Sequence, residues 1–113
     1  MILEELNHLL SDLEIPVESG VFSDVAPSQY CVLTPLTDDF DLFANNQPTI
    51  DVQEVRISFF SKGNYLKVKN QIIQNLLKAD FTITSRLFLG FDEETNYYHV
   101  AIDVAKHYEM EEY

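Results

Sequence analysis

The stretch from Asp51 to Asp80 constrains the fold most, because it alternates like a strand, turns once and then repeats like a helix. Between Val52 and Phe60, apolar and polar side chains alternate with the period of a half-buried strand. The apolar face of that strand consists of Val55, Ile57 and Phe59. This segment predicts a long strand with one face against a core.

The turn after this strand is Ser61-Lys62-Gly63-Asn64, in which Gly63 is free to adopt a positive φ and Asn64 is a good helix N-cap. The apolar residues that follow recur every three or four positions, at Tyr65, Val68, Ile72, Ile73, Leu76 and Leu77. This spacing predicts an amphipathic helix. A short connection favours folding of the helix back over the apolar face of the strand.

The rest of the chain supplies one more helix and several strands. Leucines and isoleucine at spacings of three and four predict a helix over Ile2 to Leu13, which Pro16 prevents from continuing. Strand patterns occupy Val17–Phe22, Gln29–Leu33, Phe81–Leu89 and Tyr97–Ala105. The element order α-β-β-β-α-β-β predicts an α+β fold: a mainly antiparallel mixed sheet of four or five strands with two helices packed on one face.

The predicted core combines the apolar faces of these elements. It consists of Leu6, Leu10, Val32, Val55, Ile57, Phe59, Ile72, Leu76, Ile83, Val100 and Ile102. At 113 residues the chain is expected to form one domain, 1–113, with a long loop over 36–50 and an acidic tail over 107–113 that frays.

Composition limits the compartment and the partners. No apolar run approaches the length of a membrane helix, and the first residues lack the basic region of a signal peptide, so we expect a cytoplasmic protein with no membrane partner. The net charge of −12 should repel nucleic-acid phosphates, which argues against sequence-specific nucleic-acid binding. Three interpretations of the acidic surface remain: it keeps the protein soluble, it repels DNA that passes along it, or it imitates DNA.

The segment from Thr37 to Thr49 fits no period and is read as a loop with an acidic and aromatic front half. Its notable residues are Asp38, Asp39, Phe40, Asp41, Leu42 and Phe43. The three apolar side chains among them need burial, either under the loop itself or against a partner chain. A calcium loop is a poor fit, because the glycine and the distal glutamate of such loops are missing.

No catalytic motif is present. Cys31 is a nucleophile candidate beside His8, His99 or His107, but its apolar strand favours a buried structural thiol. His99 and Asp103 share a strand face, which favours a surface pair over a ligand set. Lys62, Lys67, Lys69 and Lys78 gather on and near the second helix, as a solvated face or as a charged contact with another chain. The sequence therefore predicts no cofactor, no metal and no small-molecule substrate.

The order of motifs along the chain does resemble a family. A leucine-rich helix runs into Ile15-Pro16-Val17, and Pro27-Ser28-Gln29-Tyr30-Cys31-Val32 follows. A long loop then leads to the strand that ends in Phe60-Ser61-Lys62. This order resembles the tail-completion and tail-terminator proteins of long-tailed bacteriophages and prophages, with their runs "Ile-Pro-Val", "Pro-Pro-Tyr-Ile-Val-Tyr" and "Tyr-Thr-Lys". The chain differs in having Ser28-Gln29 before the tyrosine and Phe60-Ser61 before the lysine.

The resemblance implies a structural, non-enzymatic role. Such proteins form a ring, often hexameric, that ends the tail tube and presents a surface to the head. The implied partners are other copies of the chain, the tail-tube protein and head-connector proteins, and the implied locations are the virion tail and, during assembly, the host cytoplasm. The guessed subunit interface comprises Asp38, Asp39, Phe40, Asp41, Leu42, Phe43, Lys67 and Lys69. The alternatives are a head–tail adaptor, an acidic DNA mimic that inhibits a host protein, and a small enzyme using Cys31.

Overall fold

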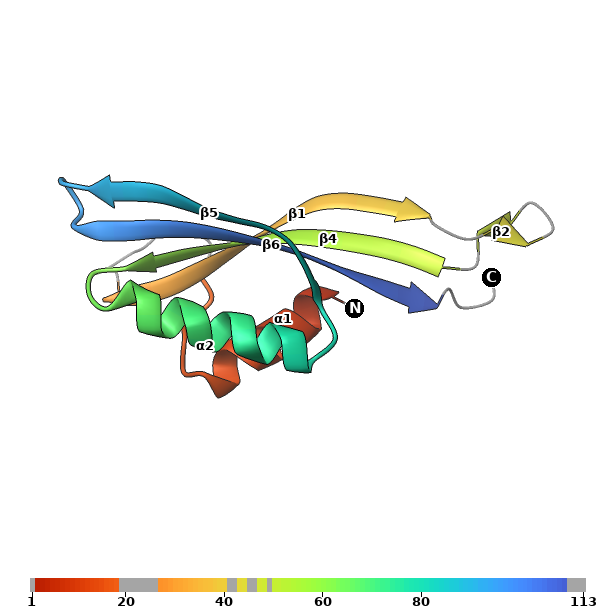
Figure 1. Cartoon of the computed structure of the whole chain (residues 1–113), viewed down its shortest axis with the longest axis horizontal. Coiled ribbons are helices and arrows are strands. Elements are labelled where there is room, and N and C mark those ends of the chain that lie inside the picture. The colour runs from red at the N-terminus through yellow and green to blue at the C-terminus, as the bar shows by residue number, and fades with distance from the viewer. Residues whose placement is uncertain (1, 19–26, 41–42, 45–46, 49, 110–113) are drawn as a thin grey trace.

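The chain forms an elongated antiparallel sheet with two helices on one of its faces (Figure 1). The computed structural model describes residues 2–18, 27–40, 43–44, 47–48 and 50–109, and between 37 and 48 it describes the backbone alone. The elements are α1 (Ile2–Asp12), β1 (Gln29–Phe40), β2 (Phe43–Ala44), β3 (Gln47–Pro48), β4 (Ile50–Ser61), α2 (Tyr65–Lys78), β5 (Thr82–Asp92) and β6 (Tyr97–Glu109). The predicted α+β class is confirmed.

Four long strands make the main sheet in the order β1-β4-β6-β5, and every neighbouring pair is antiparallel. One of its two central strands, β4, is the strand that the sequence pattern predicts from Val52 to Phe60. The predicted strand over Val17–Phe22 appears only as a parallel bridge of Val17 to Cys31, and residues 19–22 lie outside the described part. The short strands β2 and β3 pair with one another in a separate hairpin.

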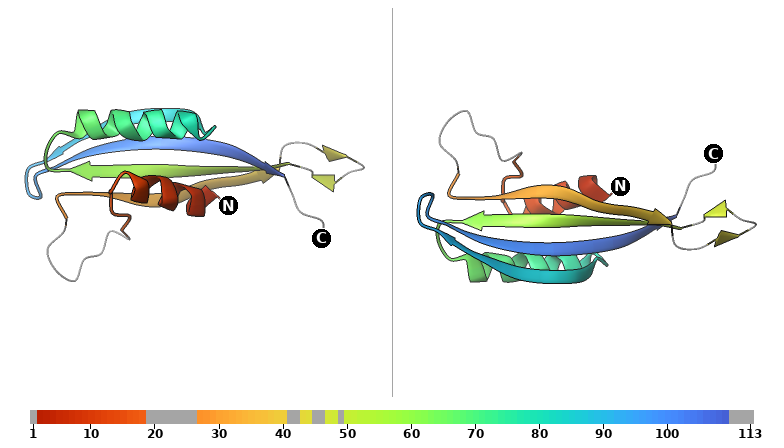
Figure 2. Two further views of the ribbon diagram at one scale, coloured as in Figure 1. Left: turned by 90° about the horizontal axis from the view of Figure 1, so that it is seen from below. Right: turned by 90° about the horizontal axis from the view of Figure 1, so that it is seen from above.

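Both helices cover the same face of the sheet, with α1 over β1 and β4 and α2 over β6 and β5 (Figure 2). Between them and the sheet lies the core, which contains nine of the eleven predicted residues as buried side chains. Ile83 is only partly buried against this core. Val32 is wrong as a core residue: the strand turns Cys31 toward the helices, so its neighbour Val32 points to the opposite face.

Of the two predictions for the turn before α2, one is confirmed and the other is wrong. Asn64 caps the helix, since its side-chain oxygen accepts a hydrogen bond from the backbone N–H of Lys67 at 3.4 Å. Gly63 does not use a positive φ; of the glycines in the described residues, the one that does is Gly90, at φ 117° in β5. At Gly63 the N–H donates to the Ser61 hydroxyl at 3.2 Å instead, so the turn closes through a side chain.

The sheet is longer than the sequence pattern indicates. β1 continues through Asp38 and Asp39 to Phe40, which lies opposite Asp51 of β4, so the front of the predicted 36–50 loop is strand. β6 likewise reaches Glu109, opposite Ile50, so 107–109 of the predicted acidic tail is strand and 110–113 lies outside the described residues. The acidic residues have low strand propensity, but a continuous partner strand on β4 outweighs that propensity.

The helices are too short to cover the sheet along its whole length. β6 has 13 residues, about 43 Å of strand, whereas α2 has 14 residues, about 21 Å of helix. The end of the sheet that contains Phe40, Ile50 and Glu109 therefore projects beyond the helix layer (Figure 1).

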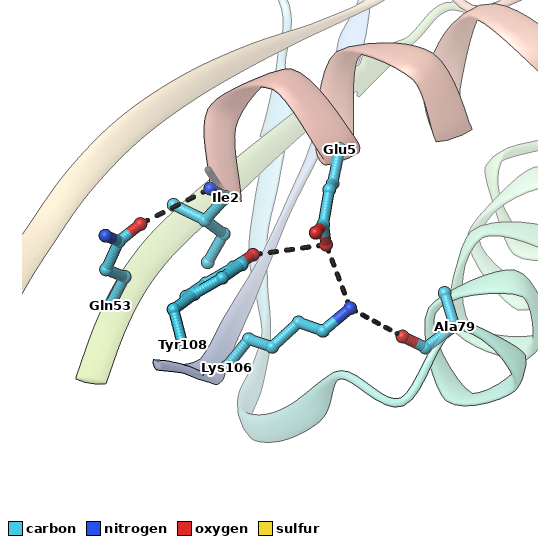
Figure 3. A network of polar contacts seen from close by, with 6 residues as sticks. All are labelled: Ile2, Glu5, Gln53, Ala79, Lys106 and Tyr108. Carbon is cyan, nitrogen blue, oxygen red and sulfur yellow. Dashed lines mark hydrogen bonds and ion pairs between the residues drawn. The ribbon is translucent and has the colours of Figure 1, made fainter. Parts of the chain in front are cut away.

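A polar network fastens α1 to the sheet near this projecting end (Figure 3). Lys106 of β6 donates to a carboxylate oxygen of Glu5 at 2.9 Å and to the backbone carbonyl of Ala79, after α2, at 3.0 Å. The Tyr108 hydroxyl donates to the same Glu5 oxygen at 3.1 Å, and the side-chain oxygen of Gln53 accepts from the N–H of Ile2 at 3.3 Å. One lysine thus joins both helices to β6.

Candidate assembly surfaces

The sheet face away from the helices, called the open face below, bears a row of stacked rings. Tyr30 of β1, Phe60 of β4 and His99 of β6 are direct cross-strand neighbours. The ring centroids of Tyr30 and Phe60 lie 4.8 Å apart with planes 15° from parallel, and those of Phe60 and His99 lie 4.2 Å apart at 20°. Tyr97 meets Tyr30 edge-on at 5.4 Å. Stacks of this kind stiffen one end of the open face.

An ion pair lies on the same face, nearer the middle of the sheet. Arg56 of β4 donates two hydrogen bonds to the carboxylate of Asp103, from Nε at 2.8 Å and from Nη2 at 3.0 Å. The predicted pairing of His99 with Asp103 is therefore wrong, because Asp103 pairs with Arg56 instead. The His99 and Asp103 side chains do share this face. The carboxylate raises the pKa of Arg56, chiefly through its hydrogen bonds.

The surroundings of His99 favour the neutral form of its imidazole. Burial lowers the pKa of its imidazole, and the positive charge of Arg56 lowers it further. Its Nε2 atom is buried and has no hydrogen-bond partner within the described residues. The imidazole stacks on Phe60, whose ring has no oxygen or nitrogen to bond with it.

Cys31 lies on the helix side of β1, fully buried in the core. Burial raises the pKa of its thiol to about 12, so the thiol stays protonated and unreactive at neutral pH. His99 lies on the opposite face of the sheet from Cys31. The geometry favours the buried structural thiol over the nucleophile.

A second surface is apolar and exposed. It is formed by α2 and the edge strand β5, and we call it the β5–α2 edge; its large hydrophobic residues are Leu66, Leu77, Leu87, Phe88, Leu89 and Phe91. Within the described residues, large exposed hydrophobic side chains number seven, 39–56% exposed, and the seventh is Leu36 on β1. So many on one side of a small protein indicate a contact surface.

Two bulges explain why sequence reasoning missed the β5–α2 edge. The pattern predicts that Leu87 and Leu89 share the core face of β5 with Phe81 and Ile83. The register of β5 against β6 shifts between Ile83 and Ser85 and again between Phe88 and Gly90. A shift of one residue exchanges the two faces of a strand. The unbroken run Leu87-Phe88-Leu89, apolar on both faces, was the available signal in the sequence.

The guessed interface residues fall into two separate places. Asp38, Asp39 and Phe40 end β1 opposite Gln53, Val52 and Asp51, and Phe43 begins β2. Asp41 and Leu42 lie outside the described residues. Lys67 and Lys69 belong to α2, near the other end of the sheet, so one copy of the chain does not bring the two sets together (Figure 1).

The sequence matches no protein-family model and no curated protein. Among the residues described, no cluster of three or more histidine, cysteine or acidic side chains is placed to hold a metal ion. In that same part of the chain, neither helix has the length and apolar character needed to cross a membrane.

Proposed function

We propose that this chain is a structural, non-enzymatic protein of a bacteriophage or prophage tail, which ends the tail tube and joins it to the head as a ring of several copies. It would act in the virion tail after assembly in the host cytoplasm. Its partners would be other copies, the tail-tube protein and head-connector proteins. The proposal requires no cofactor, no small-molecule substrate, no membrane and no sequence-specific contact with nucleic acid.

The observation that carries the proposal is the β5–α2 edge. A sheet edge with Leu87, Phe88, Leu89 and Phe91 exposed is costly for a free monomer and invites association. The order of sequence motifs, which resembles that of tail-terminator proteins, supports a ring as the form of this association. A ring requires two different surfaces on each copy, and a four-stranded sheet with two unlike edges offers them.

The proposal also assigns a contact to the guessed interface at 38–43. The end of the sheet that contains Asp38 and Asp39 projects past the helices, where it is available to the tube or to a neighbouring copy. We expect Phe40 and Phe43 to be buried on docking. The carboxylates of 38–41 would pair with Lys67 or Lys69 of the next copy, or line the channel and keep passing DNA from sticking.

The direct test is deletion of the coding sequence from the phage or prophage that carries it. The proposal expects tails of abnormal length, or heads and tails that do not join, as counted by electron microscopy. Normal infectious particles after deletion would overturn the proposal. A head–tail adaptor, the nearest alternative, would leave free tails of normal length, so tail length separates the two.

A second variant tests the projecting end alone. The double change Phe40→Ala and Phe43→Ala should reduce the yield of joined particles without unfolding the protein. The double change Leu87→Ala and Leu89→Ala should reduce it as well, because the proposal places the β5–α2 edge in the contact between copies. Fully infectious particles with the phenylalanine variant would remove 38–43 from the interface and leave the rest of the proposal standing.

A further inference from the structure

We infer that copies of this chain associate head to tail, with the β5–α2 edge of one copy against the α1 and β1 side of the next. This inference rests on the proposed function for one point, that the chain associates with itself. It adds which surfaces meet and in which orientation.

The segment that forms the β5–α2 edge is basic as well as apolar, and two of its cations, Lys69 of α2 and Arg86 of β5, lie on that edge. Residues 62–91 contain five of the seven basic residues of the chain and a single acidic one, Asp80. On α2, Leu66, Lys69, Ile73 and Leu77 follow one another at spacings of three and four, so they form one stripe of the helix. The groove between α1 and α2 is lined by Asn75 and Lys78, and this stripe therefore lies on the flank turned away from α1.

Arg86 extends this basic and apolar stripe onto the sheet. It pairs with Ile102, and Phe88 pairs with Val100, in the register of β5 on β6. The Phe88 ring stacks on Tyr65 of α2 with centroids 5.5 Å apart, which joins helix and strand into one surface. Within the described residues Lys69 and Arg86 form no ion pair, whereas Arg56 and Lys106 do.

The opposite side of the molecule is acidic. Residues 2–18 contain five acidic residues, Glu4, Glu5, Asp12, Glu14 and Glu18, and no lysine or arginine. A shallow groove lined by Asn7, Ser11, Glu14, Pro16 and Val17 runs along the outer flank of α1, toward β1. Glu5 is held by Lys106, but Glu4 and Glu14 are exposed and free to meet a cation. The two sides thus have complementary charge.

The topology allows the two sides to meet. β1 and β5 are opposite edges of a four-stranded antiparallel sheet, so they run in opposite directions. When β5 of one copy lies beside β1 of the next, the antiparallel order continues. Both helices lie on one face, so the outer flank of α1 then comes beside the Lys69 stripe of α2 (Figure 2). Repetition of such a contact gives a closed ring or a filament.

The β1 side also contributes an apolar residue. Leu36 is the one exposed large hydrophobic side chain of the described residues that lies off the β5–α2 edge, and it bulges from β1 next to Pro35. Pro35 has no N–H to donate, and Pro16 to Glu18 already pair with Cys31. Neighbouring copies would therefore touch chiefly through side chains, with Leu36 packed against Phe88 or Phe91.

A two-fold contact between two β5–α2 edges is the competing arrangement for a second copy. It would also bury apolar side chains, but it would place Lys69 and Arg86 of one copy against the same cations of its partner. Each copy has a net charge of −12, so contact of unlike surfaces is the arrangement that offsets repulsion between copies. The charge distribution favours the head-to-tail contact.

The test uses cysteine cross-linking of the full chain, with Thr34→Cys on β1 and Leu87→Cys on β5, both exposed positions. Each variant alone should stay uncross-linked with a short bis-maleimide, while their mixture should give a covalent dimer of one copy of each. The wild type is the background control, because Cys31 is buried. Cross-linking of the Leu87→Cys variant alone would overturn the inference in favour of the two-fold contact.

Charge reversal supplies an independent measurement by sedimentation equilibrium. Arg86→Glu and Glu14→Arg should each weaken association roughly tenfold, and the chain with both changes should recover it. Lys78→Glu changes net charge by the same amount as Arg86→Glu but lies in the groove toward α1, off the Leu66–Leu77 stripe, so it should have little effect. Equal losses from Lys78→Glu and Arg86→Glu, without recovery in the doubly changed chain, would overturn the inference.

The result separates this inference from the proposed function. Wild-type association that none of the variants alters would overturn the assigned surfaces, while tail length after deletion would still decide the function. A wild type that stays monomeric up to about 1 mM, where weak specific complexes are half formed, would overturn the inference outright.

Discussion

Arg56 and Asp103 are direct partners across the central pair of strands, and they lie on the sheet face that no helix covers. Two hydrogen bonds join them, at 2.8 and 3.0 Å, one to each oxygen of the carboxylate. The Asp103 side chain is 9% exposed and that of Arg56 is 38% exposed, so the acid is the buried member of the pair.

Asp103→Asn should therefore lower the melting temperature by several degrees. The buried carboxylate accepts two hydrogen bonds from Arg56, and the asparagine amide has a single oxygen to accept them. Thermal unfolding followed by circular dichroism measures the change, with Asp12→Asn on the exposed end of α1 as control. The variant with both Arg56→Gln and Asp103→Asn should lose less than the two single losses added together. Strict additivity would mean that the pair contributes nothing.

Leu76 and Leu77 offer a test of how α2 is oriented. Leu76 is fully buried in the core and Leu77 is 56% exposed, although the two are adjacent in sequence and identical in kind. Leu76→Ala should cost about 2–5 kcal/mol of unfolding free energy, from lost burial and the cavity left behind. Leu77→Ala should stay within about 0.5 kcal/mol in urea denaturation. Similar costs for both would mean that α2 does not face the core as described.

The periodic segments explain why the fold class could be predicted. Apolar residues every second position in β4 and every third or fourth in α2 determine which side chains meet, and Ile57, Ile72 and Leu76 are buried accordingly. The strand ends could not be predicted in this way. The segments around Asp38, Asp39 and His107 show no apolar alternation. They are strand because β1 pairs with one edge of β4 and β6 pairs with its other edge.

The candidate surfaces were predictable only in part. Clustering of lysines on α2 is visible in the sequence, and the structure adds that Lys69 shares a stripe with Leu66 and Leu77. The apolar edge at β5 depends on two register shifts, which no local pattern reveals. The partner of Asp103 is equally non-local, since Arg56 is 47 residues away in sequence.

Cys31 should be unreactive in the folded protein. Because burial raises the pKa of its thiol to about 12, reaction with a thiol reagent such as DTNB at pH 8 should occur only after unfolding. Cys31→Ala should cost about 1 kcal/mol, the order expected for one small buried group, and leave assembly intact. Loss of assembly in a folded Cys31→Ser protein would restore the reading of Cys31 as a functional nucleophile.

Glu5 should make stability depend on pH at the acidic end. Burial by itself raises the pKa of its carboxyl group, but hydrogen bonds from Lys106 and Tyr108 outweigh burial and lower the pKa from 4.5. A lowered folded-state pKa stabilises the fold above the unfolded-state pKa, and that stabilisation is lost as pH falls through the folded-state value. The pair is partly exposed, so its contribution at pH 7 should stay below about 1 kcal/mol.

Tyr108 should make the stability that this network contributes decrease at alkaline pH. Burial raises the pKa of its hydroxyl above 10.0, and the charge of Glu5 raises it further. A raised folded-state pKa stabilises the fold below the unfolded-state pKa, and this stabilisation is lost as pH rises through the folded-state value. The network should therefore contribute most between the two limits, around neutral pH.

Glu5→Gln tests both statements, because it keeps the shape of the side chain and removes its charge. The variant should be less stable than the wild type at pH 7 in urea denaturation, and the difference should shrink as pH falls below 4.5. Glu4→Gln is the matched control, since Glu4 is exposed and one position away on the same helix. A Glu5→Gln deficit that stays constant from pH 7 to pH 3 would mean that the carboxylate charge does not fasten α1 to β6.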